Sequence, residues 1–125
     1  MTLFVKEPNW KPLIDVVSKE HFKLLLIVGP SQSGKTTLLR EIGSVYGFAH
    51  INLGEELSRR MVVRPIRHRD SEADDIASEI IEQANANKIT IDNTEILFEH
   101  PIQMDPIKFL RNLSVHRTII ATING

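Results

Sequence analysis

The run KLLLIV at Lys23–Val28 is the feature that most limits the folds open to this 125-residue chain. A short, continuous apolar run is typical of a strand that is buried on both faces of a sheet. It is far too short to cross a bilayer. A glycine-containing turn and a helix from about Lys35 to Val45 follow directly. A strand of this kind needs helices packed on both of its sides, which predicts an α/β protein.

The remaining segments alternate between helical and extended patterns. Helices are expected at Pro12–Lys19, Glu55–Met61 (one or two turns), Asp70 or Ser71 to Ala84, and Pro106–Leu113. Strands are expected at Ala49–Leu53, Lys88–Ile91 and Arg117–Thr122. Asp105 followed by Pro106 is a typical helix start. This alternation predicts parallel strands joined by helical crossovers, in one domain spanning residues 1–125.

The turn after the first apolar strand matches G-x-x-x-x-G-K-[ST] at every fixed position. Backbone N–H groups of such a loop form a concave anion site, and the following helix directs its positive end at the same point. A lysine there binds the β and γ phosphates, and the hydroxyl after it is a ligand for Mg²⁺. The predicted nucleotide-binding residues are Gly29, Pro30, Ser31, Gln32, Ser33, Gly34, Lys35, Thr36 and Thr37.

A second acidic element follows the strand at Lys88–Ile91. Asp92 stands at its carboxyl end, where P-loop proteins hold Mg²⁺ together with the loop hydroxyl, here that of Thr36. The alternative for Asp92 is a capping role. Many P-loop ATPases place a glutamate next to activate water, but this chain has Asn93, which cannot accept a proton. Glu95 could then reach back as the base, or Asn93 could merely orient the water. The alternative for Glu95 is a surface or partner residue.

Two further positions bear on nucleotide recognition. Thr122 and Asn124 end the last strand, and one of them could sense the γ-phosphate, with Asn124 preferred because its amide can donate. The alternative is that Asn124 forms a turn with Gly125. Trp10 is expected to anchor the core or a lid rather than to stack on a base. Without an N-K-x-D element nothing indicates guanine, so ATP is the expected nucleotide.

Charge is unevenly distributed although the net charge is −1. The segment Arg59–Arg69 has five arginines and no acid, whereas Asp70–Glu99 has nine acids and one base. The basic block predicts either a DNA contact or a solvated surface paired with the acidic helix that follows. The DNA contact would use Arg59, Arg60, Arg64, Arg67 and Arg69. No cysteine and no long apolar segment are present, so we expect a cytoplasmic protein without membrane contact.

Four stretches resemble the BrxF family, the small P-loop ATPase component of type 3 BREX phage-defence systems. They are LLLIVGPSQSGKTTLLREI, INLGEELS, ITIDNTEILFEHPIQMDPIKFLRNLS and RTIIATING. The resemblance implies ATP and Mg²⁺ binding by Lys35, Thr36 and Asp92, with Asn93 and Glu95 in the acidic element. It also implies partners among other defence-system proteins that act on DNA. The resemblance implies a longer chain that continues past the final Asn-Gly. A missing C-terminal segment is therefore one expectation.

The expected fold is a three-layer P-loop NTPase sandwich with a mostly parallel sheet. In the AAA-like strand order 5-1-4-3-2, the strand at Lys23–Val28 neighbours Arg117–Thr122, and strand 5 has no counterpart here. The free edge would be a pairing hazard. We expect the N-terminal segment, another chain or a missing C-terminal segment to cover it. In a homo-oligomer, an arginine could complete the site of a neighbouring subunit, with Arg111 preferred over Arg117 and the basic block.

Three functions are compatible with these residues. The first is a Mg²⁺-dependent ATPase that acts as a switch or as an oligomeric subunit in phage defence. The second is a nucleotide-gated assembly subunit with little hydrolysis, which Asn93 favours. The third is a small-molecule kinase, which the sequence supports least because only Arg59–Arg69 could serve as its lid.

Overall fold

The computed structural model describes residues 2–3, 10–30, 34–61, 66–95 and 105–124, and for residues 2–3, 66–74 and 124 only the backbone. Within these residues strands and helices alternate along nearly the whole chain. The elements are β1 (Thr2–Leu3), α1 (Lys11–Val17), β2 (Leu24–Gly29), α2 (Lys35–Tyr46), β3 (Ala49–Asn52), α3 (Leu53–Met61), α4 (Ile66–Ala84), β4 (Lys88–Asp92), α5 (Pro106–Leu113) and β5 (Thr118–Asn124).

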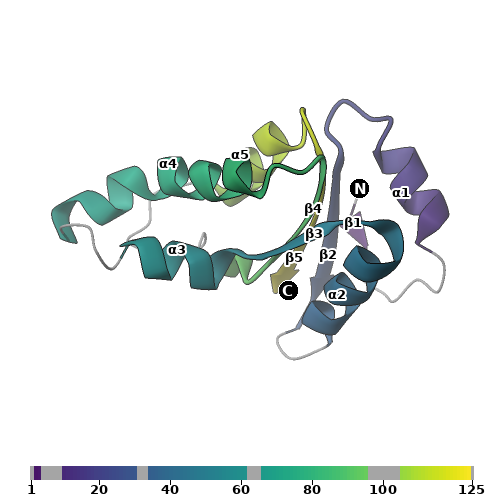
Figure 1. Ribbon diagram of the computed structural model, residues 1–125, viewed down its shortest axis with the longest axis horizontal. Helices are drawn as coiled ribbons and strands as arrows, with labels where there is room; N and C mark the ends of the chain where they lie inside the picture. The colour runs from purple at the N-terminus through teal and green to yellow at the C-terminus, as the bar shows by residue number, and fades with distance from the viewer. Residues whose placement is uncertain (1, 4–9, 31–33, 62–65, 96–104, 125) are drawn as a thin grey trace.

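The strands form one parallel sheet in the order β1-β2-β5-β4-β3. Helices α1 and α2 cover one face, and α3, α4 and α5 cover the other, so the chain has three layers (Figure 1). This confirms the expected α/β class and the expected neighbours of the KLLLIV strand. Because every strand is parallel, all strand carboxyl ends lie at one edge of the sheet and all amino ends at the other.

The sequence predicts that another segment covers the outer edge of β2. The N-terminal strand β1 pairs with β2 there, with Thr2 opposite Leu26 and Leu3 opposite Ile27. Of the three expected covers, the N-terminal segment is therefore the one observed.

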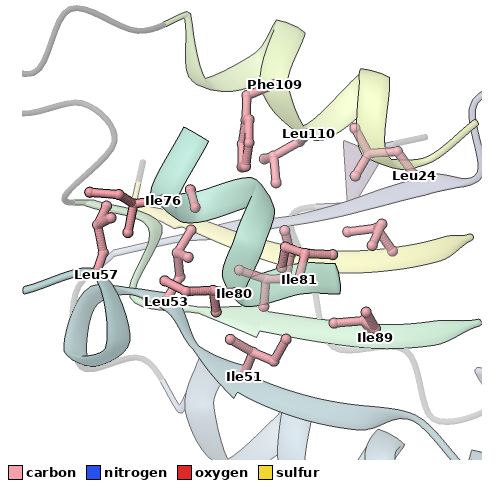
Figure 2. Close-up of a cluster of buried hydrophobic side chains, with 14 of the residues drawn as sticks. Leu24, Ile51, Leu53, Leu57, Ile76, Ile80, Ile81, Ile89, Phe109 and Leu110 are labelled. Atoms are coloured by element: carbon pink, nitrogen blue, oxygen red, sulfur yellow. The ribbon is translucent and has the colours of Figure 1, made fainter. Parts of the chain in front are cut away.

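Two apolar clusters hold the layers together. One joins α3, α4 and α5 to the sheet, and Figure 2 shows its side chains, with Ile81, Ile89 and Leu110 fully buried. The other lies under α1 and α2 and contains Trp10, Ile14 and Leu39. Trp10 is 6% exposed, which confirms its assignment to the core. Each fully buried side chain of this size contributes roughly 1.5–3 kcal/mol.

The helix α4 starts earlier than the sequence analysis expects. It begins at Ile66, so Asp70 and Ser71 lie inside the helix and are not its caps. The expectation was wrong because polar capping residues are tolerated inside a helix, and no glycine or proline interrupts residues 66–84. By contrast, Asp105 caps α5 as predicted, since its side chain accepts the N–H of Lys108 at 3.1 Å.

None of the helices in the described part of the chain has the length and apolar character needed to cross a membrane.

Candidate functional site

The loop between β2 and α2 lies at the carboxyl edge of the sheet. Gly29 ends β2 and α2 begins at Lys35, immediately after Gly34. Gly34 has φ +90°, a left-handed conformation that side-chain-bearing residues rarely adopt. The Lys35 ammonium group donates to the Gly29 carbonyl at 2.9 Å and to the Pro30 carbonyl. Lys35 therefore folds back across the start of the loop.

The N-terminal end of α2 is built to accept an anion. Its N-cap, Gly34, has no side chain to accept from the N–H groups of the first turn, and that turn contains no acid. A 12-residue helix has a partial positive charge at this end, so an anionic group is favoured there. Thr36 and Thr37 are exposed in the same turn. The predicted residues Ser31, Gln32 and Ser33 lie outside the described residues.

The Asp92 carboxylate lies at the same edge, at the end of β4. Ile89 and Ile91 belong to the cluster under α3–α5, so strand alternation turns Asp92 toward the layer of α2. The residue is 4% exposed. Its Oδ1 accepts the Asn93 backbone N–H at 2.9 Å and the Thr122 hydroxyl at 3.1 Å. A buried carboxylate held from two directions has a fixed orientation.

Thr122 and Asn124 are the residues from which a phosphate sensor is predicted. Thr122 is 1% exposed and donates to Asp92, so in this structure it supports the carboxylate. Its own carbonyl accepts the Thr94 hydroxyl, which links β5 to the turn after β4. Asn124 pairs in register with Gly29, so its backbone lies beside the start of the loop. Its side chain lies outside the described residues.

Asn93 is connected to a residue that the sequence analysis did not identify. Its side-chain N–H₂ donates to Asn52 Oδ1 at 2.9 Å, and the same oxygen accepts the Glu55 N–H at 3.0 Å. Asn52 thus caps α3 and holds Asn93 at once. Asn93 has φ +54°, and its Cβ lies only 2.9 Å from where a Cβ on Gly54 would be. The ends of β3 and β4 and the start of α3 therefore form one tight junction.

Glu95 lies two residues beyond Asn93 and is half-buried. The hydrogen bonds and ion pairs of the described residues include none to its carboxylate. The geometry thus leaves both predicted roles of Glu95 open.

His50 and Thr90 are further polar residues next to this edge. Thr90 lies two residues before Asp92 on β4, and His50 pairs with it in register on β3. The His50 ring nitrogen Nδ1 lies 3.0 Å from the Thr90 hydroxyl. Burial lowers the pKa of His50, the negative charge of Asp92 opposes that shift, and the positive charge of Arg40 adds to it. The neutral imidazole is therefore favoured at neutral pH.

The described part of the basic block is ion-paired. Arg59 lies 3.1 Å from Glu55 and 3.2 Å from Glu56, and Arg60 lies 3.7 Å from Glu56. Arg60 also donates to Gln83 of α4 at 2.7 Å. This matches the expected solvated surface, although the acids come from α3 itself and not from the helix that follows. Arg64 and the side chains of Arg67 and Arg69 lie outside the described residues.

The two arginines considered for action in a neighbouring subunit lie at the other edge of the sheet. Arg111 is in the last turn of α5, and Arg117 directly precedes β5. Arg117 pairs with Glu82 at 3.2 Å. Neither is near the loop of its own chain, because the length of the strands separates the two edges.

Few of the described side chains could coordinate a magnesium ion at this site. No group of three or more histidine, cysteine, aspartate or glutamate residues that could hold a metal occurs in the described ranges. One carboxylate and one hydroxyl, with phosphate and water oxygens, are the usual ligands of Mg²⁺ in nucleotide sites. Asp92 and Thr36 provide that pair of ligand types at one edge of the sheet, so the residues fit a nucleotide-bound ion.

The fold and the site together define an α/β protein with a parallel sheet and polar residues gathered at its carboxyl edge. No protein-family model matches the chain, and no solved structure matches it significantly.

Proposed function

We propose that this chain is an ATP-binding P-loop protein that hydrolyses ATP with Mg²⁺ and acts as a switch or an oligomeric subunit. The observation that carries the proposal is the pairing of two features at one sheet edge. One is the glycine-capped N-terminus of α2 with Lys35, and the other is the buried Asp92 carboxylate. The first suits a polyphosphate, and the second suits the cation that accompanies it.

Each residue has a definite part in this proposal. Lys35 exchanges the Gly29 and Pro30 carbonyls for phosphate oxygens, to which its charge is better matched. The first-turn N–H groups of α2 donate to the same phosphates. Thr36 and Asp92 hold Mg²⁺, which neutralises charge on the phosphates when bound. The Thr122 hydroxyl keeps Asp92 oriented.

A second candidate is a nucleotide-gated assembly subunit with little hydrolysis. The Asn93 amide cannot accept a proton, and it already donates to Asn52. In that case nucleotide binding changes the junction of Asn93, Asn52 and α3 without rapid turnover. The resemblance to the BrxF family supports a cytoplasmic protein that forms homo-oligomers and works with other phage-defence components in either case.

The deciding experiment measures steady-state phosphate release from ATP with Mg²⁺ over a range of protein concentrations. The wild type is compared with Lys35→Ala and with a matched control, Lys108→Ala, which removes an exposed lysine from α5 on the opposite face. Binding of a fluorescent ATP analogue is measured in parallel, with Mg²⁺ and with a chelator.

The outcomes separate the candidates. Release that needs Mg²⁺, vanishes in Lys35→Ala and persists in Lys108→Ala supports the ATPase. Release that rises more than linearly with protein concentration adds that subunits complete the site for one another. Analogue binding without release supports the gated subunit. Release only after a nucleoside or metabolite is added indicates a kinase, and absence of binding in the wild type refutes the proposal.

A further inference from the structure

The amino edge of the sheet, opposite the candidate nucleotide site, is rich in positive charge. Four connections meet there, at residues 18–23, 46–49, 84–88 and 111–118, and three of them lie at the top of the view in Figure 1. Their charged residues are five cations and a single acid, Glu20. The cations are Lys19, Lys23, Lys88, Arg111 and Arg117. The whole chain has a net charge of −1, so this edge differs sharply from the average surface.

The strand register brings three of these cations close together. The Ile119 N–H bonds to the Lys23 carbonyl at 2.8 Å, and Lys88 pairs with Thr118 in register. Lys23 and Lys88 therefore flank the start of β5, and their backbones are two strand spacings apart, about 10 Å. Arg117 precedes β5 between them.

Neutral groups hold the cations of this edge in place. Lys23 Nζ donates to the Val115 carbonyl at 3.0 Å, the Arg111 guanidinium lies 4.5 Å from the Phe22 ring centre, and Lys88 Nζ lies 5.9 Å from that of Phe48. Among the described residues, none of these three is in a salt bridge, whereas Arg117 pairs with Glu82. These contacts restrict the three side chains without placing a carboxylate beside them.

The arginines of α3 can be compared with the cations of the amino edge. Arg59 and Arg60 are equally basic, but both have glutamate partners within one helical turn. A polyanion would have to displace those acids to bind there, so its gain would be small. At the amino edge Arg117 pairs with Glu82, but among the described residues Lys23, Lys88 and Arg111 have no carboxylate partner that a polyanion would have to displace.

We propose that the amino edge of the sheet binds the phosphodiester backbone of a nucleic acid. The span of about 10 Å from Lys23 to Lys88 matches the axial rise of about three phosphates along one strand of a duplex. The exposed groups around the cations are amides and imidazoles that can donate to phosphate oxygens. They are Asn85, Asn87, Asn112, His21 and His116.

A nucleic acid fits this edge better than an acidic protein does. A protein partner normally buries an apolar anchor at the centre of its interface. The exposed large apolar residues in the described part of the chain, Val16 and Val45, lie on α1 and α2 and not in these connections. Backbone contacts of this kind carry no base information, so the binding is expected to be independent of sequence.

The test is fluorescence anisotropy with a labelled DNA duplex and a labelled single strand of mixed sequence, titrated with the full chain at several salt concentrations. The test variant is Lys88→Gln with Arg111→Gln, which changes two exposed side chains that bond to no backbone group of the described residues. Its affinity should fall at least about tenfold at low salt, and the slope of log K against log salt should decrease in size by nearly 2. Adding Lys23→Gln should reduce both further.

A control variant separates this surface from others. Arg59→Gln with Arg60→Gln removes the same formal charge from α3 and should leave the affinity within about twofold, since those arginines are already neutralised. The titration contains no nucleotide, so failure of the proposed nucleotide site would not affect its result. Circular dichroism melts confirm that each variant is folded.

Three outcomes would overturn the proposal. The first is no binding to either DNA at low salt. The second is an equal loss of DNA affinity in the α3 variant and the amino-edge variant, which indicates a general charge effect. The third is tighter binding of a polyglutamate peptide than of DNA through the same residues, which indicates an acidic protein partner.

Discussion

Gly54→Ala tests the tight junction between α3, Asn52 and Asn93. A Cβ at position 54 would lie 2.9 Å from the Asn93 Cβ and 3.0 Å from the Asn93 carbonyl oxygen. Carbon atoms in contact prefer about 3.5–4.0 Å, so one element must move by roughly 0.5–1 Å. Asn93 cannot yield easily because it is a non-glycine residue at φ +54° and its amide is bonded to Asn52.

Whether Gly54→Ala stabilises or destabilises the protein depends on the gain in helix propensity and the cost of the clash with Asn93. In a helix, alanine is favoured over glycine by at most about 1 kcal/mol. Overpacking against groups that cannot move costs about 1–3 kcal/mol, and breaking the Asn93–Asn52 hydrogen bond adds about 0.5–1.5 kcal/mol. Taken at their midpoints, these terms leave a net loss of about 2 kcal/mol in the free energy of unfolding for Gly54→Ala. For a domain of this size that is a fall in Tm of roughly 3–10 °C, measured by circular dichroism.

A double-mutant cycle with Asn93→Gly isolates the clash from other effects. Removing the Asn93 side chain leaves only the carbonyl contact, so Gly54→Ala should become close to neutral in that background. Comparing Ser58→Gly with Ser58→Ala, at an exposed position of the same helix, measures the glycine-to-alanine propensity gain alone. If Gly54→Ala raised the Tm of the otherwise unchanged chain, the close approach inferred at this junction would be refuted.

Three further perturbations test separate contacts. Thr122→Val removes the hydroxyl that donates to Asp92 and should cost about 1.5–3 kcal/mol in urea unfolding, whereas Thr122→Ser, which keeps the hydroxyl, should lose about half as much. Burial lowers the pKa of His50, so the unfolded chain takes up its proton first as pH falls below about 6.5. The free energy of unfolding should therefore decline there until the lowered pKa is passed, and His50→Gln should decline less in the same pH series. An equal decline would exclude His50 as a cause. Asp105→Ala removes the N-cap of α5 and should cost about 1 kcal/mol by thermal unfolding, while Asp105→Asn should retain most of the stability.

Local patterns were sufficient to predict much of this fold. The run at Leu24–Val28 is a strand with neighbours on both edges and helices over both faces, as its unbroken apolar character requires. Asp105 caps α5 because capping depends on residues three positions apart. The glutamate–arginine pairs of α3 also follow from spacings of three and four, although the expected partners of these arginines were the acids of the following helix.

The contacts that sequence reasoning missed depend on the register between distant strands. Asn52 and Asn93 are 41 residues apart and meet because Asn52 pairs with Asp92 at the end of β3. Thr122 reaches Asp92 across 30 residues, and no periodicity links the two. The unusual glycine at the second position of α3, Gly54, was the one local signal of a close approach, because a helix start has no other need for it.

The parallel sheet keeps the two proposed binding regions apart, and this separation has a measurable consequence. From Lys23 to Pro30 the chain runs along the whole of β2, roughly 20 Å at the usual rise of a strand. The Debye length at physiological salt is about 8 Å, so phosphates at one edge exert little direct force on cations at the other. Without a rearrangement of the sheet, saturating ATP with Mg²⁺ should therefore change the DNA affinity by less than about twofold. The anisotropy titration, repeated with and without nucleotide, measures this directly. A tenfold change would show that charge alone does not account for the link. Such a link would require an element with two arrangements. The first candidate is the junction of Asn52, Asn93 and α3. This junction connects the end of β4 to α3, which lies on the face of the sheet opposite α2.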